Sequence, residues 1–341
     1  MINYISSLFK DKQKIFLANT NPAVENLRRK VTAEHAEFVT ITKFLSKDVS
    51  NDCDILCLDE CSTISNRDMV RVLQRAQCKL LVLVGDIYQI ESILFGNWFN
   101  IAYKVMPKDS VAELTRPHRT TVQGLIEVWN KVREITEDRL EFITRNGLSS
   151  TLDESIFSRT EEDEIVLCLN YDGIYGINNI NKFLQSNNVN PSINWGVLSY
   201  KVGDPVLFNE SNRFAPLVYN NLKGKILQIE EEEDCIYFTI EVYTVLNELD
   251  VIGFDLELKE SVTDETSVIR FKVGRGGDGN DDNDNVENVV PFQVAYAISI
   301  HKAQGLEYES VKVVITSEIE EMVSHNIFYT AITRAKSKLK I

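Results

Sequence analysis

The sequence has no long hydrophobic run anywhere in its 341 residues. A membrane-spanning helix needs about 18 or more consecutive apolar residues, so the sequence predicts a chain without a membrane segment. Residues 1–10 also lack the basic stretch and the small-residue cleavage site of a secretory signal. These absences favour a cytoplasmic protein.

Cysteine is scarce, with six residues in the whole chain. Six scattered cysteines are too few for the disulfide framework of a secreted domain. Cys53, Cys57 and Cys61 are spaced by four, which could arrange a metal or iron–sulfur site. They lie in an apolar run and the turn after it, so free buried thiols are the better interpretation.

Positive charge is in deficit, because 36 basic residues face 51 acidic ones and the net charge is −15. The imbalance is local. Residues 230–290 contain 18 acidic and 4 basic side chains, a balance of −14, which leaves the rest of the chain near −1. Net charge usually argues against a nucleic-acid partner when it is strongly negative. Here it decides nothing, because one acidic segment masks a nearly neutral remainder.

Short apolar runs that end in polar residues recur along the chain, and helical patterns separate them. The runs cover residues 14–18, 54–58, 80–84, 165–169 and 311–315. Such runs are typical of strands buried on both faces of a parallel sheet. Helices are predicted over 22–31, 66–76, 122–132 and 178–186, the first capped by Asn21. Ligands bind at the carboxyl ends of parallel strands, which is where the polar residues lie.

The pattern changes near residue 201, where short strands bounded by turns begin at 203–208 and 223–229. Alternating segments continue to about residue 273, and a low-complexity acidic stretch over 274–285 is expected to be a mobile loop. The α/β pattern resumes after Pro291. We therefore predict a small all-β insertion over 201–285.

Three weaker patterns have ordinary explanations. Gly274, Gly276 and Gly279 match the spacing of a dinucleotide-binding loop, but no helix follows them. Residues 278–285 resemble a calcium loop without its central glycine and final glutamate. The aromatic cluster over 95–99 either stacks nucleic-acid bases or packs in the core.

The first chemically suggestive pattern is an acidic pair after a strand. Asp59 and Glu60 follow the apolar run 54–58 directly, as in a Walker B pair that holds Mg²⁺ and orients an attacking water. The next strand ends in Gly85 and Asp86, with Gln89 close behind, where an amide could face a terminal phosphate. On its own, each of these patterns is weak.

Basic residues that suit phosphoryl transfer follow later in the chain. Arg116 and Arg119 lie after a turn, and guanidinium groups neutralise the charge of a phosphoryl-transfer transition state. The segment 301–307 reads His-Lys-Ala-Gln-Gly-Leu-Glu, and 329–335 reads Tyr-Thr-Ala-Ile-Thr-Arg-Ala.

In this order the segments resemble the motifs of superfamily 1 helicases, most of all the RecD-like and UvrD-like branch. Residues 17–21 resemble motif Ia, Thr42 with Phe44 the small motif after it, and Asp59-Glu60 motif II. Gly85-Asp86 with Gln89 resembles motif III, Arg119 the motif IV arginine, and the segments 301–307 and 329–335 motifs V and VI. The resemblance covers nearly the whole chain.

The resemblance implies two RecA-like motor domains that bind ATP and Mg²⁺ between them. The first would cover 1–115, the second 116–200 and 286–341, with an SH3-like insertion over 201–285. Asp59 would hold Mg²⁺, Glu60 would be the catalytic base and Gln89 would sense the γ-phosphate. Arg119 and Arg334 would act as arginine fingers from the second motor domain.

The residues implied near the nucleotide are Gly85, Asp86, Gly305 and Glu307. Those implied near a single nucleic-acid strand are Thr20, Asn21, Thr42, His301 and Lys302.

One family motif is missing from the sequence. Gly-x-x-x-x-Gly-Lys-Ser/Thr, whose amides and lysine hold the phosphates, does not occur in the 341 residues. Residues 1–10 look like the end of the helix that follows such a loop, and residues 339–341 look like part of a strand. We therefore expect the chain to be a fragment of a longer motor, with its first domain truncated at the N-terminus.

The sequence predicts an ATP-dependent helicase or translocase acting on single-stranded DNA, moving 5′ to 3′ as the RecD-like branch implies. One alternative is a module that binds nucleic acid or a protein partner without hydrolysis. Another is a related RNA helicase, because the motor motifs do not distinguish the sugar. An upstream fused domain is also compatible with the resemblance.

Overall fold

The structure is a computed structural model, and it separates the chain into two compact units. It describes residues 2–46, 51–90, 96–114, 119–209, 213–215, 217–261, 263–275, 288–319 and 322–341. Unit 1 comprises Met1–Gly147, Gln304–Glu307 and Glu321–Ser337, and unit 2 comprises Leu148–Ala303, Tyr308–Glu320 and Lys338–Ile341. Within the described ranges, no helix combines the length and the apolar character needed to cross a membrane.

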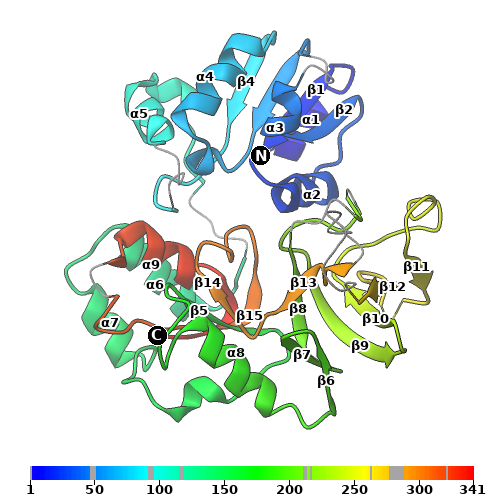
Figure 1. Ribbon diagram of the computed structural model, residues 1–341. Coiled ribbons are helices and arrows are strands. Elements are labelled where there is room, and N and C mark those ends of the chain that lie inside the picture. The colour runs from blue at the N-terminus through cyan, green and yellow to red at the C-terminus, as the bar shows by residue number, and fades with distance from the viewer. Residues whose placement is uncertain are drawn as a thin grey trace. The chain divides into compact units, whose positions relative to one another are not determined.

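Unit 1 is built on a parallel sheet with the strand order β2-β1-β3-β4 (Figure 1). Its strands are β1 (Lys14–Ala18), β2 (Ala36–Thr40), β3 (Ile55–Leu58) and β4 (Leu80–Leu83). Its α-helices are α1 (Ile2–Leu8), α2 (Asn21–Lys30), α3 (Ile41–Leu45), α4 (Asn66–Arg75), α5 (Trp98–Val105), α6 (Gln123–Arg133), α7 (Arg139–Arg145) and α9 (His325–Ile332). Short 3₁₀ turns are η1 (Cys61–Thr63) and η2 (Lys108–Ser110).

The central strand β1 shows why this sheet forms. All five of its residues are buried. Phe16 and Ala18 belong to the apolar cluster that α2 contributes to, whereas Ile15 and Leu17 belong to the cluster formed with α3 and α4. Because successive strand side chains point to opposite faces, a continuous apolar run needs helices on both sides. The predicted parallel α/β core is confirmed.

Two local predictions in unit 1 were wrong. The run at 80–84 was expected to be buried on both faces, but β4 is an edge strand and Leu80 is 38% exposed. The cap of α2 is Thr20 and not Asn21, because the Thr20 side chain accepts a hydrogen bond from Ala23 N at 3.4 Å. Thr20 has extended backbone angles there, as an N-cap residue requires.

Unit 2 contains a second sheet, with the order β14-β5-β15-β16, in which β5 pairs in parallel with β14 and β15. Its strands are β5 (Glu164–Cys168), β14 (Ala297–Ser299), β15 (Tyr308–Val313) and β16 (Ala335–Lys340), of which the last residues lie in unit 2. Val166 and Cys168 of β5 pack against Ile177, Ile180 and Leu184. Those three belong to α8 (Ile177–Ser186), and η3 (Glu154–Phe157) precedes β5.

An antiparallel sheet, here called the β module, completes unit 2 with the order β11-β12-β10-β9-β8-β13. Its strands are β8 (Pro205–Phe208), β9 (Lys223–Glu231), β10 (Cys235–Val242), β11 (Glu257–Lys259), β12 (Ser267–Gly274) and β13 (Phe292–Val294), preceded by the hairpin of β6 (Ser192–Trp195) and β7 (Leu198–Lys201). Phe208, Phe238, Phe271 and Phe292 share its apolar core. The module therefore includes residues as far as 294, and residues 276–285 of the acidic stretch lie outside the described part.

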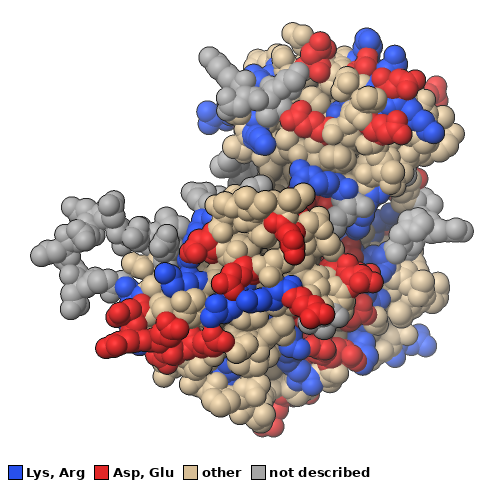
Figure 2. Space-filling model, turned by 90° about the vertical axis from the view of Figure 1, so that its right-hand side faces the viewer, with Lys and Arg blue, Asp and Glu red and all other residues tan. Residues whose placement is uncertain are grey.

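Acidic side chains of the β module are partly neutralised by neighbouring basic ones. Arg270 pairs with Glu230 at 2.6 Å, and Arg275 pairs with Glu231 at 3.0 Å. Figure 2 shows the face that carries these strands, where Lys and Arg lie interleaved with Asp and Glu. The local excess of negative charge thus coexists with ion pairs across adjacent strands.

The structure bears on the three spaced cysteines and on the aromatic cluster, for which the sequence left alternatives open. Cys53, Cys57 and Cys61 are free and buried, and no group of three or more His, Cys, Asp or Glu suited to a metal occurs among the described residues. Trp98 and Phe99 pack on the apolar core of unit 1, where the Trp98 indole donates to Ile64 O at 2.8 Å. That contact favours the core interpretation of the aromatic cluster, whose residue 95 lies outside the described ranges.

Candidate active site

The acidic pair Asp59–Glu60 and the segment that begins at Gly85 lie side by side, because the strands before them are neighbours. Asp59 and Glu60 follow β3, and Gly85 follows β4, which pairs with β3 in parallel. Beyond the strands, Cys61 N donates to Val84 O at 2.9 Å. The two segments therefore leave the sheet together, at its carboxyl edge.

Glu60 has an unusual backbone conformation. Its φ is +50° and its ψ +42°, in the left-handed region that residues other than glycine rarely adopt. Asp59 Oδ1 accepts from Glu60 N at 2.9 Å, and Glu60 O accepts from Thr63 N at 2.9 Å. These bonds hold the strained residue in place, and strain of this kind is concentrated at functional sites.

Gly85 is required by packing. A Cβ at this position would lie 2.8 Å from Phe99 Cε1 and 3.0 Å from Cys61 N, which is too close. The φ of Gly85 is not in the left-handed region, so close packing, and not a backbone conformation reserved for glycine, is what requires it. Gly305 does have a positive φ of +80°, and a Cβ there would lie 3.6 Å from Glu60 Oε1.

A cavity of about 440 Å³ in unit 1 collects most of the predicted site residues. Its lining includes the full sets predicted for catalysis and nucleotide binding, namely Asp59, Glu60, Gly85, Asp86, Gln89, Arg119, Gly305, Glu307 and Arg334. They come from segments spread over more than 270 positions of the chain. The fold therefore brings together residues that the sequence could relate only by motif order.

Arg119 is held by two acceptors. Its Nε donates to Glu307 Oε1 at 3.0 Å, and its Nη1 donates to Thr333 O at 2.5 Å. Residues 116–118, the rest of the predicted motif IV segment, lie outside the described part of the chain. The Glu307 carboxylate thus fixes one edge of the Arg119 guanidinium.

Arg334 is almost completely buried, with 1% of its surface exposed. Its Nε donates to Thr330 O at 2.9 Å and its Nη1 to Leu306 O at 3.3 Å. These acceptors are neutral carbonyls, so they orient the guanidinium without cancelling its charge. A buried cation of this kind is stabilised by anions placed close to it.

Three ionisable side chains of the cavity have shifted pKa values. Burial raises the pKa of Asp59, and burial together with the Asp59 charge raises the pKa of Glu60 against the opposing pull of Arg334 and Arg119. Burial and the nearby Arg119 charge lower the pKa of Arg334 to about 9. Perturbed acids and bases in one cavity are a mark of functional sites.

Other residues of the cavity lining were not predicted from the sequence, among them three polar residues of α1 and α2. Asn26 and Lys30 of α2 line the cavity with Asn3 of α1, and Asn26 Nδ2 lies 3.5 Å from Gly305 O. Asn26 and Lys30 are four positions apart, so they share one helix face. That spacing was readable in the sequence, but nothing there showed which way the face points.

The residues predicted to bind a nucleic-acid strand are not brought together in the same way. Thr42 lines a separate cavity of about 240 Å³ in unit 1 with Asn19 and Arg71. Thr20 and Asn21 begin α2 and line neither of these cavities. His301 and Lys302 belong to unit 2, where Lys302 Nζ donates to Gln293 Oε1 at 2.9 Å.

Comparison with known proteins agrees with the motif order. A model of the UvrD-like helicase C-terminal domain matches residues 294–341, and a model of an AAA domain matches residues 6–153. The RecD subunit of the RecBCD enzyme of Mycolicibacterium smegmatis is 23% identical over 84% of this chain and 50% of that subunit. Over these ranges the chain is therefore similar to RecD-like and UvrD-like helicases.

Solved helicase structures share the fold. The Pif1 helicase of Candida albicans matches with a TM-score of 0.55 and 16% identity, over 99% of this chain and 93% of that one. A Bacteroides Pif1 helicase in complex with ADP-AlF3 and ssDNA matches with a TM-score of 0.52 and 14% identity, over 99% and 91%. The chain spans between 30% and 61% of the length of the curated relatives that it matches.

The cavity has side chains that suit a magnesium nucleotide. Mg²⁺ prefers one or two carboxylates plus substrate phosphates to a cage made only of protein ligands, and Asp59 and Glu60 offer two carboxylates. The guanidiniums of Arg119 and Arg334 with the Lys30 ammonium offer positive charge for phosphates. Bound there, Mg²⁺ would neutralise charge on the phosphates.

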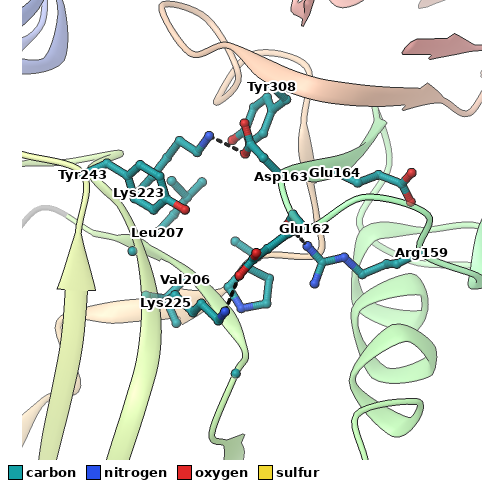
Figure 3. A pocket seen from close by; sticks show the side chains of 14 residues that line it. Arg159, Glu162, Asp163, Glu164, Val206, Leu207, Lys223, Lys225, Tyr243 and Tyr308 are labelled. Atoms are coloured by element: carbon teal, nitrogen blue, oxygen red, sulfur yellow. Dashed lines mark hydrogen bonds and ion pairs between the residues drawn. The ribbon is translucent and has the colours of Figure 1, made fainter. Parts of the chain in front are cut away.

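A second cavity, of about 90 Å³, lies in unit 2 between β5 and the β module (Figure 3). Its charged side chains are paired with one another: Lys223 Nζ lies 2.5 Å from Asp163 Oδ1, and Lys225 pairs with Glu162. Lys223 also lies over the Tyr308 ring, 4.2 Å from its centroid. Because these charged side chains pair with one another, the cavity resembles a packed contact between β5 and the β module more than a ligand site.

Proposed function

We propose that the protein carrying this chain is an ATP-driven helicase or translocase that acts on single-stranded DNA. The 440 Å³ cavity is its nucleotide site. Asp59 binds Mg²⁺, Glu60 acts as the base toward the attacking water, and Gln89 senses the terminal phosphate. Arg119 and Arg334 stabilise the negative charge that develops during transfer.

One observation supports this proposal above the others. Two carboxylates, a glutamine and two guanidiniums line one cavity, and these are groups that phosphoryl transfer uses. Burial and the charge of Arg119 lower the pKa of Arg334 in spite of the nearby Glu60 and Glu307 carboxylates, so further negative charge would favour the buried guanidinium. A polyphosphate supplies that charge.

Single-stranded DNA is proposed as the track on two grounds. The Bacteroides Pif1 helicase whose fold this chain shares was solved with ssDNA. In addition, Thr42 and Arg71 line a cavity in unit 1 whose hydroxyl and guanidinium groups suit backbone phosphates. An RNA strand of the same sequence is the comparison that tests the choice of sugar.

The test is nucleotide hydrolysis by the full-length protein with and without a single-stranded oligonucleotide. We expect DNA to stimulate hydrolysis, and Arg334→Ala to lower the stimulated rate by about 10³-fold, the range measured for arginine fingers. Arg145→Ala is the matched control, because Arg145 is an exposed arginine of unit 1 on α7. Retained hydrolysis in Arg334→Ala would remove the proposed role.

A second candidate is a module that binds strands without hydrolysis. The 341 residues contain no Gly-x-x-x-x-Gly-Lys-Ser/Thr segment, the loop whose amides and lysine hold the phosphates in P-loop enzymes, so nucleotide binding by this chain is what has to be measured. Calorimetric titration of this chain with Mg²⁺–ATP separates the candidates. Tight binding would show that the cavity suffices for nucleotide, whereas strand binding without nucleotide binding by the full-length protein would support the second candidate.

A further inference from the structure

Thr330 of α9 contacts two parts of the candidate site at once. Its Oγ1 accepts a hydrogen bond from Ile90 N at 3.0 Å, and its main-chain carbonyl accepts from Arg334 Nε at 2.9 Å. Thr330 is fully buried, and Ile90 directly follows Gln89. One residue therefore connects the segment that carries Gln89 with the side chain of Arg334.

The segment 88–90 is held to α9 at each of its residues. Asn326 Nδ2 donates to Gln89 O at 3.0 Å, one turn of helix before Thr330. The Tyr88 ring meets the Tyr329 ring edge-on, with 6.2 Å between centroids. Because Asn326 and Thr330 are four positions apart, they present one face of α9 to the carbonyl and the N–H of the single peptide group that joins Gln89 to Ile90.

At its N-terminal end, this segment forms a tight turn whose backbone N–H groups bond to Asp86. Tyr88 N donates to Asp86 Oδ1 at 2.9 Å, and Gln89 N donates to Asp86 O at 3.3 Å. A tight turn fixed at one end by Asp86 and at the other by α9 has little freedom to move alone. A displacement of Gln89 must therefore be accompanied by α9 and the Arg334 that follows it.

We propose that Thr330 is a positioning residue that keeps Gln89 and Arg334 in one fixed relation, so that both reach the terminal phosphate together. The inference rests on the proposed nucleotide site. A displacement of about 1 Å in a catalytic group can cost about 100-fold in rate. A connection that fixes two such groups to each other therefore acts on turnover more than on nucleotide affinity.

The first test compares Thr330→Val with Thr330→Ser in the full-length protein. Valine keeps the shape and removes the acceptor of Ile90 N–H, whereas serine keeps the hydroxyl. For Thr330→Val we expect about a tenfold lower kcat for strand-stimulated hydrolysis, with KM changed less than about twofold. Thr330→Ser should restore most of that loss. Equal kcat in wild type and Thr330→Val would overturn the inference.

A matched control separates positioning from loss of stability. Thr266 is also buried and donates through its hydroxyl to Glu241 at 2.9 Å, within unit 2. Thr266→Val should lower the melting temperature in the same way as Thr330→Val and leave kcat in place. A fall in kcat that follows melting temperature across both variants would mean that Thr330 has only a structural role.

Two further measurements make the outcome independent of the proposed function. Hydrogen exchange over residues 86–90 should be faster in Thr330→Val and unchanged in Thr330→Ser, whether or not the protein hydrolyses nucleotide. If exchange does not respond, the connection fails by itself. If exchange responds but wild type hydrolyses no nucleotide, the proposed function fails instead.

With hydrolysis present, Thr330→Val should add no loss in a Gln89→Ala background, because the effect acts through Gln89.

Discussion

Arg119 donates a hydrogen bond from its Nε to Glu307 Oε1 over 3.0 Å, between residues 188 positions apart in the chain. Burial raises the pKa of Glu307, but the charge and hydrogen bond of Arg119 outweigh it, with help from Lys30 and Lys336. The pKa of this carboxyl therefore lies below its usual value. A guanidinium proposed to act on phosphate is thus already anchored before any nucleotide binds.

The first prediction concerns this anchor. Glu307→Gln removes the charge that holds Arg119, and we expect it to lower the free energy of unfolding by about 1–3 kcal/mol at pH 7. A carboxyl whose folded pKa is depressed contributes stability above its unfolded pKa and loses it as pH falls through the folded value. The difference between wild type and Glu307→Gln should therefore shrink below about pH 4. Urea unfolding at both pH values measures it.

The control for this anchor is Glu318→Gln, which changes an exposed carboxylate of unit 2. It should leave the free energy of unfolding within about 0.5 kcal/mol of wild type. A Glu307→Gln penalty that stayed constant from pH 7 to below pH 4 would show that the charge of Glu307 is not what stabilises the pair.

The second prediction concerns the pH dependence of hydrolysis. A base must be deprotonated to act, and burial raises the pKa of Glu60, so activity should rise with pH through that raised pKa. The acidic limb of kcat/KM should therefore lie above the ordinary carboxyl value of about 4.3. Glu60→Gln should lower kcat by about 100-fold or more while nucleotide still binds.

The pH–rate profile of the full-length protein checks this, with Glu141→Gln on α7 as an exposed control. A limb at the ordinary carboxyl value would mean that the base is not buried as the cavity indicates. Near-normal turnover in Glu60→Gln would assign the base to another residue.

Much of the fold could be predicted from the sequence, because the strands of the parallel sheets are mostly continuous apolar runs. The predicted run 14–18 is β1 to the residue, and the four helices predicted with bounds match α2, α4, α6 and α8 within one position at either end. The cap of α2 was missed because Thr20 and Asn21 are both good caps, and only the backbone angles of Thr20 decide between them. The exposure of β4 was missed because a run of apolar residues does not reveal which strand lies at an edge.

The site shows a similar division. Motif order identified the residues that line the cavity, because their spacing follows from strand and helix ends. It gave no sign of the Arg119–Glu307 pair or of the contact between Thr330 and Ile90, which join segments 188 and 240 positions apart. Such contacts depend on how elements pack, and local patterning carries no information about that packing.

The third prediction uses the cysteines. Burial raises the pKa of Cys53 to about 11 and that of Cys57 to about 12, and a nucleophilic thiolate is therefore rare at either position. We expect the folded chain to react slowly with a thiol-specific disulfide reagent at these two positions at pH 7.5, and quickly after denaturation. Cys235, which is half-buried on the β module, should react sooner. Mass spectrometry of tryptic peptides assigns each position, and rapid labelling of Cys57 in the folded chain would contradict its burial in β3.

The fourth prediction compares two ion pairs of unit 2, one between β15 and β5 and one at the seam between β5 and the β module. Lys312 Nζ lies 2.8 Å from Glu164 Oε1, and only 8% and 2% of the two side chains are exposed. Removing one partner leaves a buried charge unpaired, so Lys312→Met should cost about 3–5 kcal/mol in the free energy of unfolding. Lys225 pairs with Glu162, which is 73% exposed, so Lys225→Met should cost less than about 1 kcal/mol.

The two variants carry the same substitution within one unit, so their difference reflects the burial of the two pairs. Denaturant unfolding at low and high salt completes the comparison. Salt should reduce the small cost of Lys225→Met, because exposed pairs are screened, and leave the cost of Lys312→Met nearly unchanged. Equal costs for both variants would mean that the seam is held by its apolar and aromatic contacts, such as Lys223 against Tyr308, and that its ion pairs only satisfy charges already buried there.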